Sequence, residues 1–92
     1  MATLDSEQLA TELAATPGWT IDDGQLTRTV TGGNFRDSLL LVNAVGFLAE
    51  RANHHPDISV SWNEVTLHLV SHSEGGLTGA DFALAREISQ LG

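Results

Sequence analysis

The feature that most constrains the fold of this chain is a regular alternation of apolar and polar side chains on both sides of the polar dipeptide Asn63-Glu64. The apolar positions are every second residue on each side of it: Ile58, Val60, Trp62, Val65, Leu67 and Leu69. A period of two is typical of strands that bury one face. We predict an antiparallel hairpin turning at Asn63-Glu64, which sets Trp62 against Val65, Val60 against Leu67 and Ile58 against Leu69.

A second hairpin is indicated upstream by Asp23-Gly24, a dipeptide that favours the tight turn between two strands. This turn sets Ile21 against Leu26 and Trp19 against Arg28. From the residues alone, Trp19 is then a core aromatic, a partner of the Arg28 guanidinium in a cation–π pair, or a ligand contact.

Two of three predicted helices are recognised by their starts. Asp5, with Gln8 three residues later, forms a capping box for a short amphipathic helix that ends at Pro17-Gly18. Thr78 caps the last helix, and Asp81 at its third position can reach back to the cap. That structural role is sufficient by itself to explain an aspartate at this position.

The longest helix is predicted over residues 35–52, with Asn34 as its cap. One apolar stripe comprises Phe35, Leu39, Val42, Gly46 and Ala49, and other apolar side chains cover the remaining faces: Leu40, Leu41, Val45, Phe47 and Leu48. A helix that is apolar nearly all round is buried on more than one side. Its second partner is either the rest of this domain or another subunit, and we expect a homo-oligomer.

Together these elements predict a single domain over residues 1–92 of the α+β class. The order is α-β-β-α-β-β-α, which gives a four-stranded antiparallel sheet with three helices on one face. The 92 residues support only a modest core.

Composition excludes several classes of function. Twelve acidic residues against four arginines give a net charge of −8, which would repel a nucleic acid backbone. The longest apolar run, 39–49, is interrupted by Asn43 and is too short for a membrane span. There is no cysteine, and residues 1–5 lack the features of a secretory signal, so we expect a cytoplasmic protein.

Histidines are the candidates for chemistry. His54-His55-Pro56 precedes the second hairpin and His72 follows it, and the predicted register extended outward places His55 opposite His72. Clustered imidazoles favour general acid–base catalysis, because each can give or take a proton near neutrality. The alternative is an exposed connector with a strand-end histidine. A zinc site is disfavoured because adjacent histidines rarely aim at one metal and no cysteine assists. His68 is predicted to be a surface histidine outside the cluster.

The histidines belong to a longer pattern that resembles the pterin-4a-carbinolamine dehydratase family, also called the dimerisation-cofactor family. The matching residues extend over essentially the whole chain: Gly18-Trp19, Gly24, Phe35, Glu50, His54-His55-Pro56, Trp62-Asn63, Val65, Leu67, Leu69, Ser71-His72, Gly76-Leu77-Thr78 and Asp81.

The resemblance implies a hydro-lyase that dehydrates a 4a-hydroxytetrahydrobiopterin-type pterin to the quinonoid dihydropterin in tetrahydropterin recycling. It implies no metal and no organic cofactor. The family's active-site histidines match His54, His55 and His72, while its surrounding Trp and Asp match Trp19 and Asp81. It also implies a homodimer or homotetramer in which the long helices pack together.

The dehydration chemistry needs an acid at the departing oxygen and a base at a ring N–H. Our hypothesis makes His55 and His72 this pair, while His54 orients the pterin. Asp81 or Glu50 would hold an imidazole tautomer and Trp19 would offer an apolar wall. Further polar contacts to the pterin would come from Asn53, Ser71 and Ser73.

An alternative of another class is a non-catalytic interaction module that binds a partner protein as a transcriptional coactivator or assembly factor. Three intact motif histidines favour the enzyme, because a scaffold has no physical need for facing imidazoles.

Overall fold

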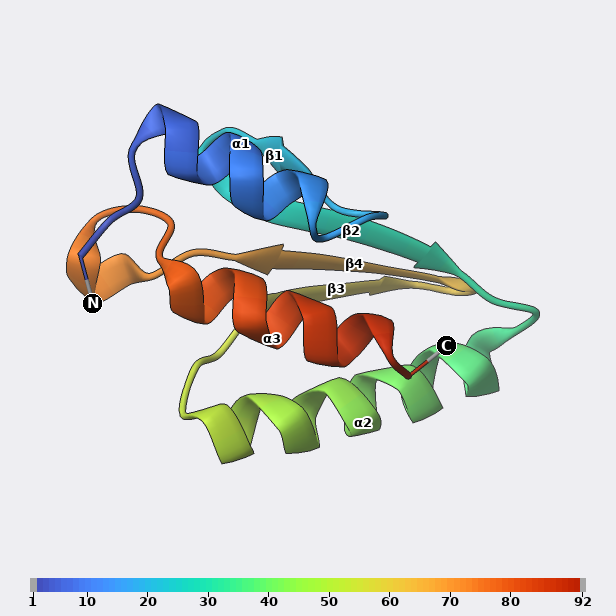
Figure 1. The fold of residues 1–92 in the computed structure, drawn as a ribbon. Helices are drawn as coiled ribbons and strands as arrows, with labels where there is room; N and C mark the ends of the chain where they lie inside the picture. Colours follow the sequence, from blue (N-terminus) through green and yellow to red (C-terminus); the bar gives the residue numbers. More distant parts are fainter. Residues whose placement is uncertain (1, 92) are drawn as a thin grey trace.

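The computed structural model describes residues 2–91, and its elements follow the predicted order (Figure 1). The helices are α1 (Ser6–Ala14), α2 (Phe35–Ala52) and α3 (Gly79–Ser89). The strands are β1 (Thr20–Asp22), β2 (Gln25–Thr31), β3 (Asp57–Ser61) and β4 (Glu64–Leu69), and a 3-10 turn, η1 (His72–Glu74), lies between β4 and α3.

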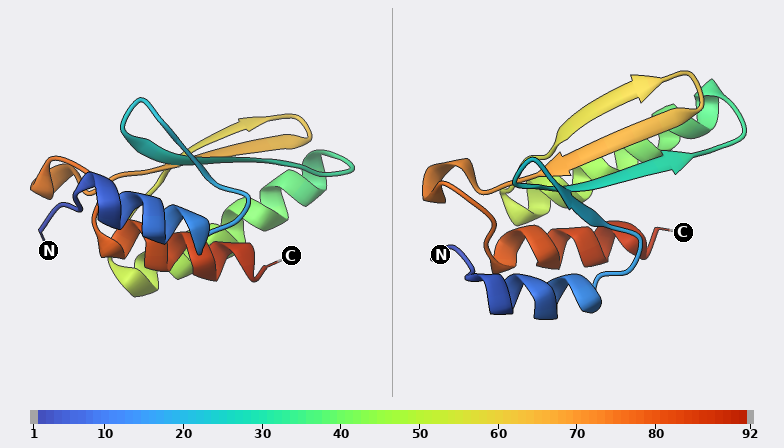
Figure 2. Two further views of the ribbon diagram at one scale, coloured as in Figure 1. Left: turned by 45° about the horizontal axis from the view of Figure 1, so that its top comes forward. Right: turned by 90° about the horizontal axis from the view of Figure 1, so that it is seen from above.

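The four strands form one antiparallel sheet in the order β1-β2-β4-β3, and all three helices cover the same face of it (Figure 2). The predicted α+β class is therefore confirmed. The opposite face carries hydroxyl side chains such as Thr29 and Thr66, whose oxygens lie 3.1 Å apart. Across residues 2–91, no helix combines the length and apolarity that crossing a bilayer requires.

The helix starts are as predicted. Asp5 and Gln8 form a complete capping box for α1, and the Asn34 side chain accepts the Asp37 N–H at the start of α2. Thr78 and Asp81 form a second capping box at α3. Local sequence determines these boundaries, because each cap uses side chains within three residues of the backbone donors it satisfies.

The first hairpin has the predicted register, with Ile21 opposite Leu26 across the Asp23-Gly24 turn. Trp19 lies just before β1 and is 4% exposed, within the core. Its indole N–H donates to Ser89 Oγ at 2.9 Å, and Arg28 donates to the same oxygen at 3.1 Å. The two side chains therefore share a hydrogen-bond acceptor on α3.

The predicted register of the second hairpin is wrong by two residues. Val60 pairs with Val65 and Ile58 with Leu67, so Trp62-Asn63 forms the turn. Contacts from outside the hairpin fix it there: Ser38 Oγ donates to the Trp62 carbonyl at 2.7 Å, and the Gly32 N–H donates to the Asn63 carbonyl at 2.7 Å. A two-residue shift leaves every side chain on its original face, so the apolar pattern satisfies both registers.

The core-facing stripe of α2 also differs from the predicted one. Val45, Leu48 and Ala49 are buried, whereas Phe35 and Leu39 are exposed. The core residues that these three meet are on the sheet and on α3: Leu26, Val65, Leu67, Leu69, Phe82, Leu84, Ala85 and Ile88. The helix is apolar on several faces, so its sequence alone could not determine which one turns inward.

Candidate active site

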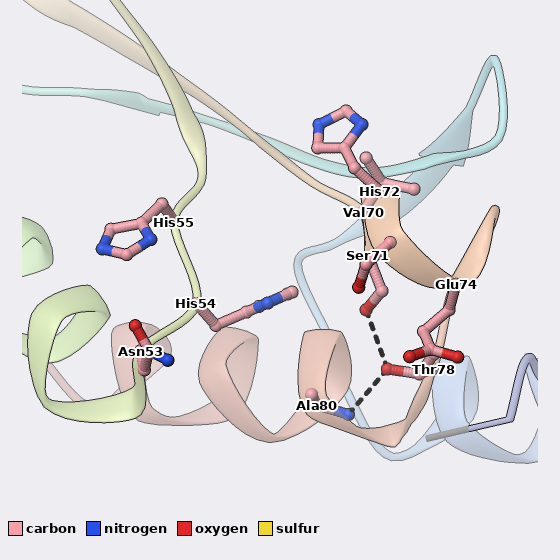
Figure 3. A pocket seen from close by; sticks show the side chains of 10 residues that line it. Asn53, His54, His55, Val70, Ser71, His72, Glu74, Thr78 and Ala80 are labelled. Carbon is pink, nitrogen blue, oxygen red and sulfur yellow. Dashed lines mark hydrogen bonds between the residues drawn. The ribbon is translucent and has the colours of Figure 1, made fainter.

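A pocket of about 450 Å³ lies where the connection from α2 to β3 faces the connection from β4 to α3. Three of the four histidines of the chain contribute to it, together with small, polar and acidic side chains. The lining residues are Asn53, His54, His55, Val70, Ser71, His72, Ser73, Glu74, Thr78 and Ala80 (Figure 3).

One wall of the pocket is positioned by the end of α2. Asn53 closes the helix in the left-handed conformation, at φ 50° and ψ 45°, which asparagine tolerates better than most residues. The His54 N–H donates to the Ala49 carbonyl at 3.0 Å, and this bond closes the end of the helix. The chain therefore leaves the helix directly after Asn53. His54 and His55 follow on the extended segment that leads into β3.

The opposite wall is positioned by the end of β4. The strand stops at Leu69, Ser71 makes an isolated bridge with Gly76, and His72 begins the 3-10 turn that Gly75 closes at φ 78°. His72 is therefore not a cross-strand partner of His55, and the predicted pairing of the two is wrong. They line the same pocket from opposite walls instead, because two loops meet there (Figure 3).

His54 contacts a fully buried carboxylate. Its Nε2 lies 2.5 Å from Asp81 Oδ1, and the Asp81 side chain is 0% exposed. Asp81 Oδ2 accepts the Thr78 N–H at 2.9 Å and the Ser71 hydroxyl at 2.9 Å. A carboxylate that receives several donors away from water is held in one orientation. The capping aspartate of α3 thus also orients an imidazole.

His55 contacts a different kind of carboxylate. Its Nε2 hydrogen-bonds to Glu50 one turn back on α2, and both side chains are largely exposed, at 58% and 78%. An exposed pair of this kind is screened by water and can rearrange easily. The two neighbouring histidines therefore differ in how firmly their rings are held.

The structure brings most of the predicted site residues together. Asn53, Ser71 and Ser73 line the pocket with the three histidines, and Glu50 and Asp81 contact histidines from behind. Trp19 is the exception, because it lies in the core against Ser89 and does not line the pocket. His68 also lies elsewhere, on β4, where its Nδ1 is 3.1 Å from the Thr27 hydroxyl.

Four lining residues were not among the predicted site residues: Val70, Glu74, Thr78 and Ala80. Thr78 and Ala80 surround the start of α3, so the capping signal placed them near Asp81. No local signal indicates Val70 or Glu74, because both enter the pocket through the loop geometry after β4. Within residues 2–91, no group of three or more His, Asp or Glu side chains is arranged to hold a metal ion.

Comparisons with known proteins find relatives over nearly the whole chain. The family model described as pterin 4 alpha carbinolamine dehydratase matches residues 2–91. A relative from Nocardia farcinica is 48% identical over 96% of this chain and 93% of its own length, and one from Thermomicrobium roseum is 45% identical over 99% and 98%. Both carry the name of this dehydratase, given as a provisional assignment.

Solved structures show the same fold. The structure of a transcriptional coactivator/pterin dehydratase from Brucella melitensis has a TM-score of 0.91 at 28% identity and covers 97% of each chain. A pterin dehydratase-like protein described as a RuBisCO assembly factor in the alpha-carboxysome has a TM-score of 0.65 at 20% identity, over 79% of this chain and 84% of its own. The sequence match over nearly the whole length shows that this chain belongs to the pterin 4 alpha carbinolamine dehydratase family.

Proposed function

We propose that this protein dehydrates a 4a-hydroxytetrahydropterin to the quinonoid dihydropterin, a step of tetrahydropterin recycling. The observation that carries the proposal is the convergence of His54, His55 and His72 on one pocket from two separate loops. Two of these rings each contact a carboxylate through Nε2. A carboxylate beside a ring nitrogen favours the tautomer that carries a proton on that nitrogen.

The reaction needs two proton transfers and no redox step. The C4a–O bond breaks as an acid protonates the departing oxygen, which leaves as water, while a base removes a proton from a ring nitrogen to form the new C=N bond. Histidines on opposite walls of a pocket can reach different atoms of a bicyclic substrate bound between them. No further group is required for the atoms and electrons to balance.

The surroundings of each ring support different roles. Within residues 2–91, the His72 side chain makes no hydrogen bond, so both its ring nitrogens are available to a substrate. We assign it the acid at the departing oxygen. His55, whose Nε2–H meets Glu50, has Nδ1 available as the base, and His54 binds and orients the pterin. Asn53 and Ser73 supply polar contacts, whereas Trp19 acts as a core residue.

The test is a rate measurement on freshly generated 4a-hydroxytetrahydropterin. We expect His72→Ala to lower the dehydration rate at least about a hundredfold, the scale of general acid–base catalysis. His68→Ala is the matched control, because it removes the one histidine outside the pocket and should leave the rate unchanged. Equal rates for wild type and His72→Ala would remove His72 from the mechanism.

Binding of a partner is the second candidate function. It is supported by the exposed apolar side chains of α2, including Leu40 and Phe47 at 54% and 67%. We propose that a second copy of this chain covers them, which gives a homodimer or homotetramer. If purified protein is inactive towards the pterin, a non-catalytic interaction module becomes the better description.

A further inference from the structure

The buried contacts behind His54 form one continuous chain of hydrogen bonds. Thr78 Oγ1 lies 2.8 Å from Ser71 Oγ, which lies 2.9 Å from Asp81 Oδ2, and Asp81 Oδ1 lies 2.5 Å from His54 Nε2. Thr78 and Asp81 are 0% exposed and Ser71 is 7% exposed. The side chains of Thr78, Ser71 and Asp81 thus form one hydrogen-bonded chain that ends at Nε2 of the imidazole.

The direction of every donor in this chain can be worked out. Thr78 Oγ1 accepts the Ala80 N–H at 3.2 Å, and its own O–H has Ser71 Oγ as its acceptor. Ser71 then has its single O–H left for Asp81 Oδ2, which also accepts the Thr78 N–H. An ionised carboxylate only accepts, so His54 Nε2 must carry a proton and donate it to Oδ1. This assignment leaves no buried polar side-chain atom without a partner among the described residues.

We infer that Ser71 is a positioning residue, which through Asp81 fixes His54 in the tautomer with the proton on Nε2. Nδ1 is then the lone pair that the ring offers to a ligand, so His54 accepts a pterin N–H and does not protonate the departing oxygen. The role of His54 towards the pterin rests on the proposed dehydration, whereas the tautomer of the ring in the free protein does not depend on it. Ser71 was predicted to contact the pterin. Its hydroxyl is already engaged by Thr78 and Asp81, so we infer that it supports the His54 ring instead.

His55 provides an internal comparison. Glu50 is exposed, and among residues 2–91 no hydroxyl group hydrogen-bonds to its carboxylate, so its contact with His55 is not fixed in the same way. A difference between the two neighbouring rings therefore measures the contribution of the buried chain. The measurement needs neither substrate nor activity.

The experiment records long-range ¹H–¹⁵N NMR spectra of the full-length ¹⁵N-labelled protein without ligand, at a pH at which the imidazole rings are neutral. We expect His54 to show a single tautomer with Nε2 protonated and Nδ1 unprotonated. In Ser71→Ala the Asp81 carboxylate loses one of the two donors that hold Oδ2, so it can rotate away from the ring. Both ring nitrogens should then move towards tautomer-averaged shifts, and Ser71→Thr should restore them. Ser73→Ala removes a neighbouring hydroxyl of the same pocket that lies outside the chain, and should leave the His54 tautomer unchanged.

Turnover gives the second readout. We expect Ser71→Ala to lower kcat by about tenfold, part of the hundredfold or more that a placed proton-transfer group contributes, and Ser71→Thr to recover it. A wild-type His54 with its proton on Nδ1 would overturn the inference, and this measurement requires no variant to fold. An unchanged tautomer in folded Ser71→Ala would also overturn it. A tautomer shift in a protein without dehydratase activity would support the positioning role and reject only the proposed reaction.

Discussion

At the scale of single residues, the site depends on which carboxylate each histidine meets. Either Asp81 or Glu50 was expected to hold an imidazole, and both contact one. Glu50 is five residues from its partner, whereas Asp81 is 27 residues from His54 and reaches it only because α3 packs beside α2. Sequence indicates that such groups are present, but the packing of two helices decides the pairing.

Because Asp81 is buried and Glu50 is exposed, we expect their removal to change the free energy of unfolding by different amounts. Asp81→Ala removes the cap of α3 and leaves the Ser71, Thr78 and His54 donors without their acceptor, so we expect it to lower the free energy of unfolding by about 2–3 kcal/mol. Glu50→Ala breaks a water-exposed contact and should cost less than about 1 kcal/mol. Urea denaturation of both variants measures the difference, and equal losses would contradict the role of burial.

At the scale of elements, helix starts and strand faces could be predicted, but register and helix rotation could not. The caps at Asp5, Asn34 and Thr78 are local interactions, and sequence contains all of their partners. The turn at Trp62-Asn63 is held by Ser38 and Gly32, which lie 24 and 31 residues away in sequence, and Trp62 takes the left-handed conformation at φ 49°. No alternation of apolar residues in the hairpin contains that information.

Two glycines test how backbone conformation sets element stability. A Cβ added at Gly46 in α2 or at Gly24 in the first turn would meet nothing within 4 Å, but Gly24 has φ +74° and Gly46 is helical. We expect Gly46→Ala to raise the free energy of unfolding by about 0.5–1 kcal/mol and Gly24→Ala to lower it by about 1 kcal/mol. Denaturation curves of the two variants should shift in opposite directions. A loss of stability in Gly46→Ala would contradict the expectation that helix propensity decides the effect at this position.

At the scale of the whole molecule, the single chain leaves its longest helix half covered. Leu40 and Phe47 are seven residues apart and therefore share a face of α2, which is directed away from the buried Val45 and Leu48. In the described strands, the sheet face away from the helices carries polar side chains such as Thr29, Ser59 and Thr66, and offers no comparable apolar surface. Because a domain of 92 residues buries only a modest core, covering this face would add a large fraction of its apolar contacts.

Self-association through α2 can be separated from folding and from catalysis. We expect wild-type protein to have the mass of a dimer or tetramer by light scattering, and Leu40→Glu to lower that mass at equal concentration, because a charge would be buried against apolar side chains. Ile21→Glu, which replaces an apolar residue of 37% exposure on β1, is the matched control and should keep the wild-type mass. The pocket lining includes no residue of α2 itself, so a dissociated Leu40→Glu protein that keeps its dehydration rate would show that one chain holds the complete site. A monomeric wild type, or an unchanged mass in Leu40→Glu, would mean that the exposed face of α2 is not where copies of this chain meet.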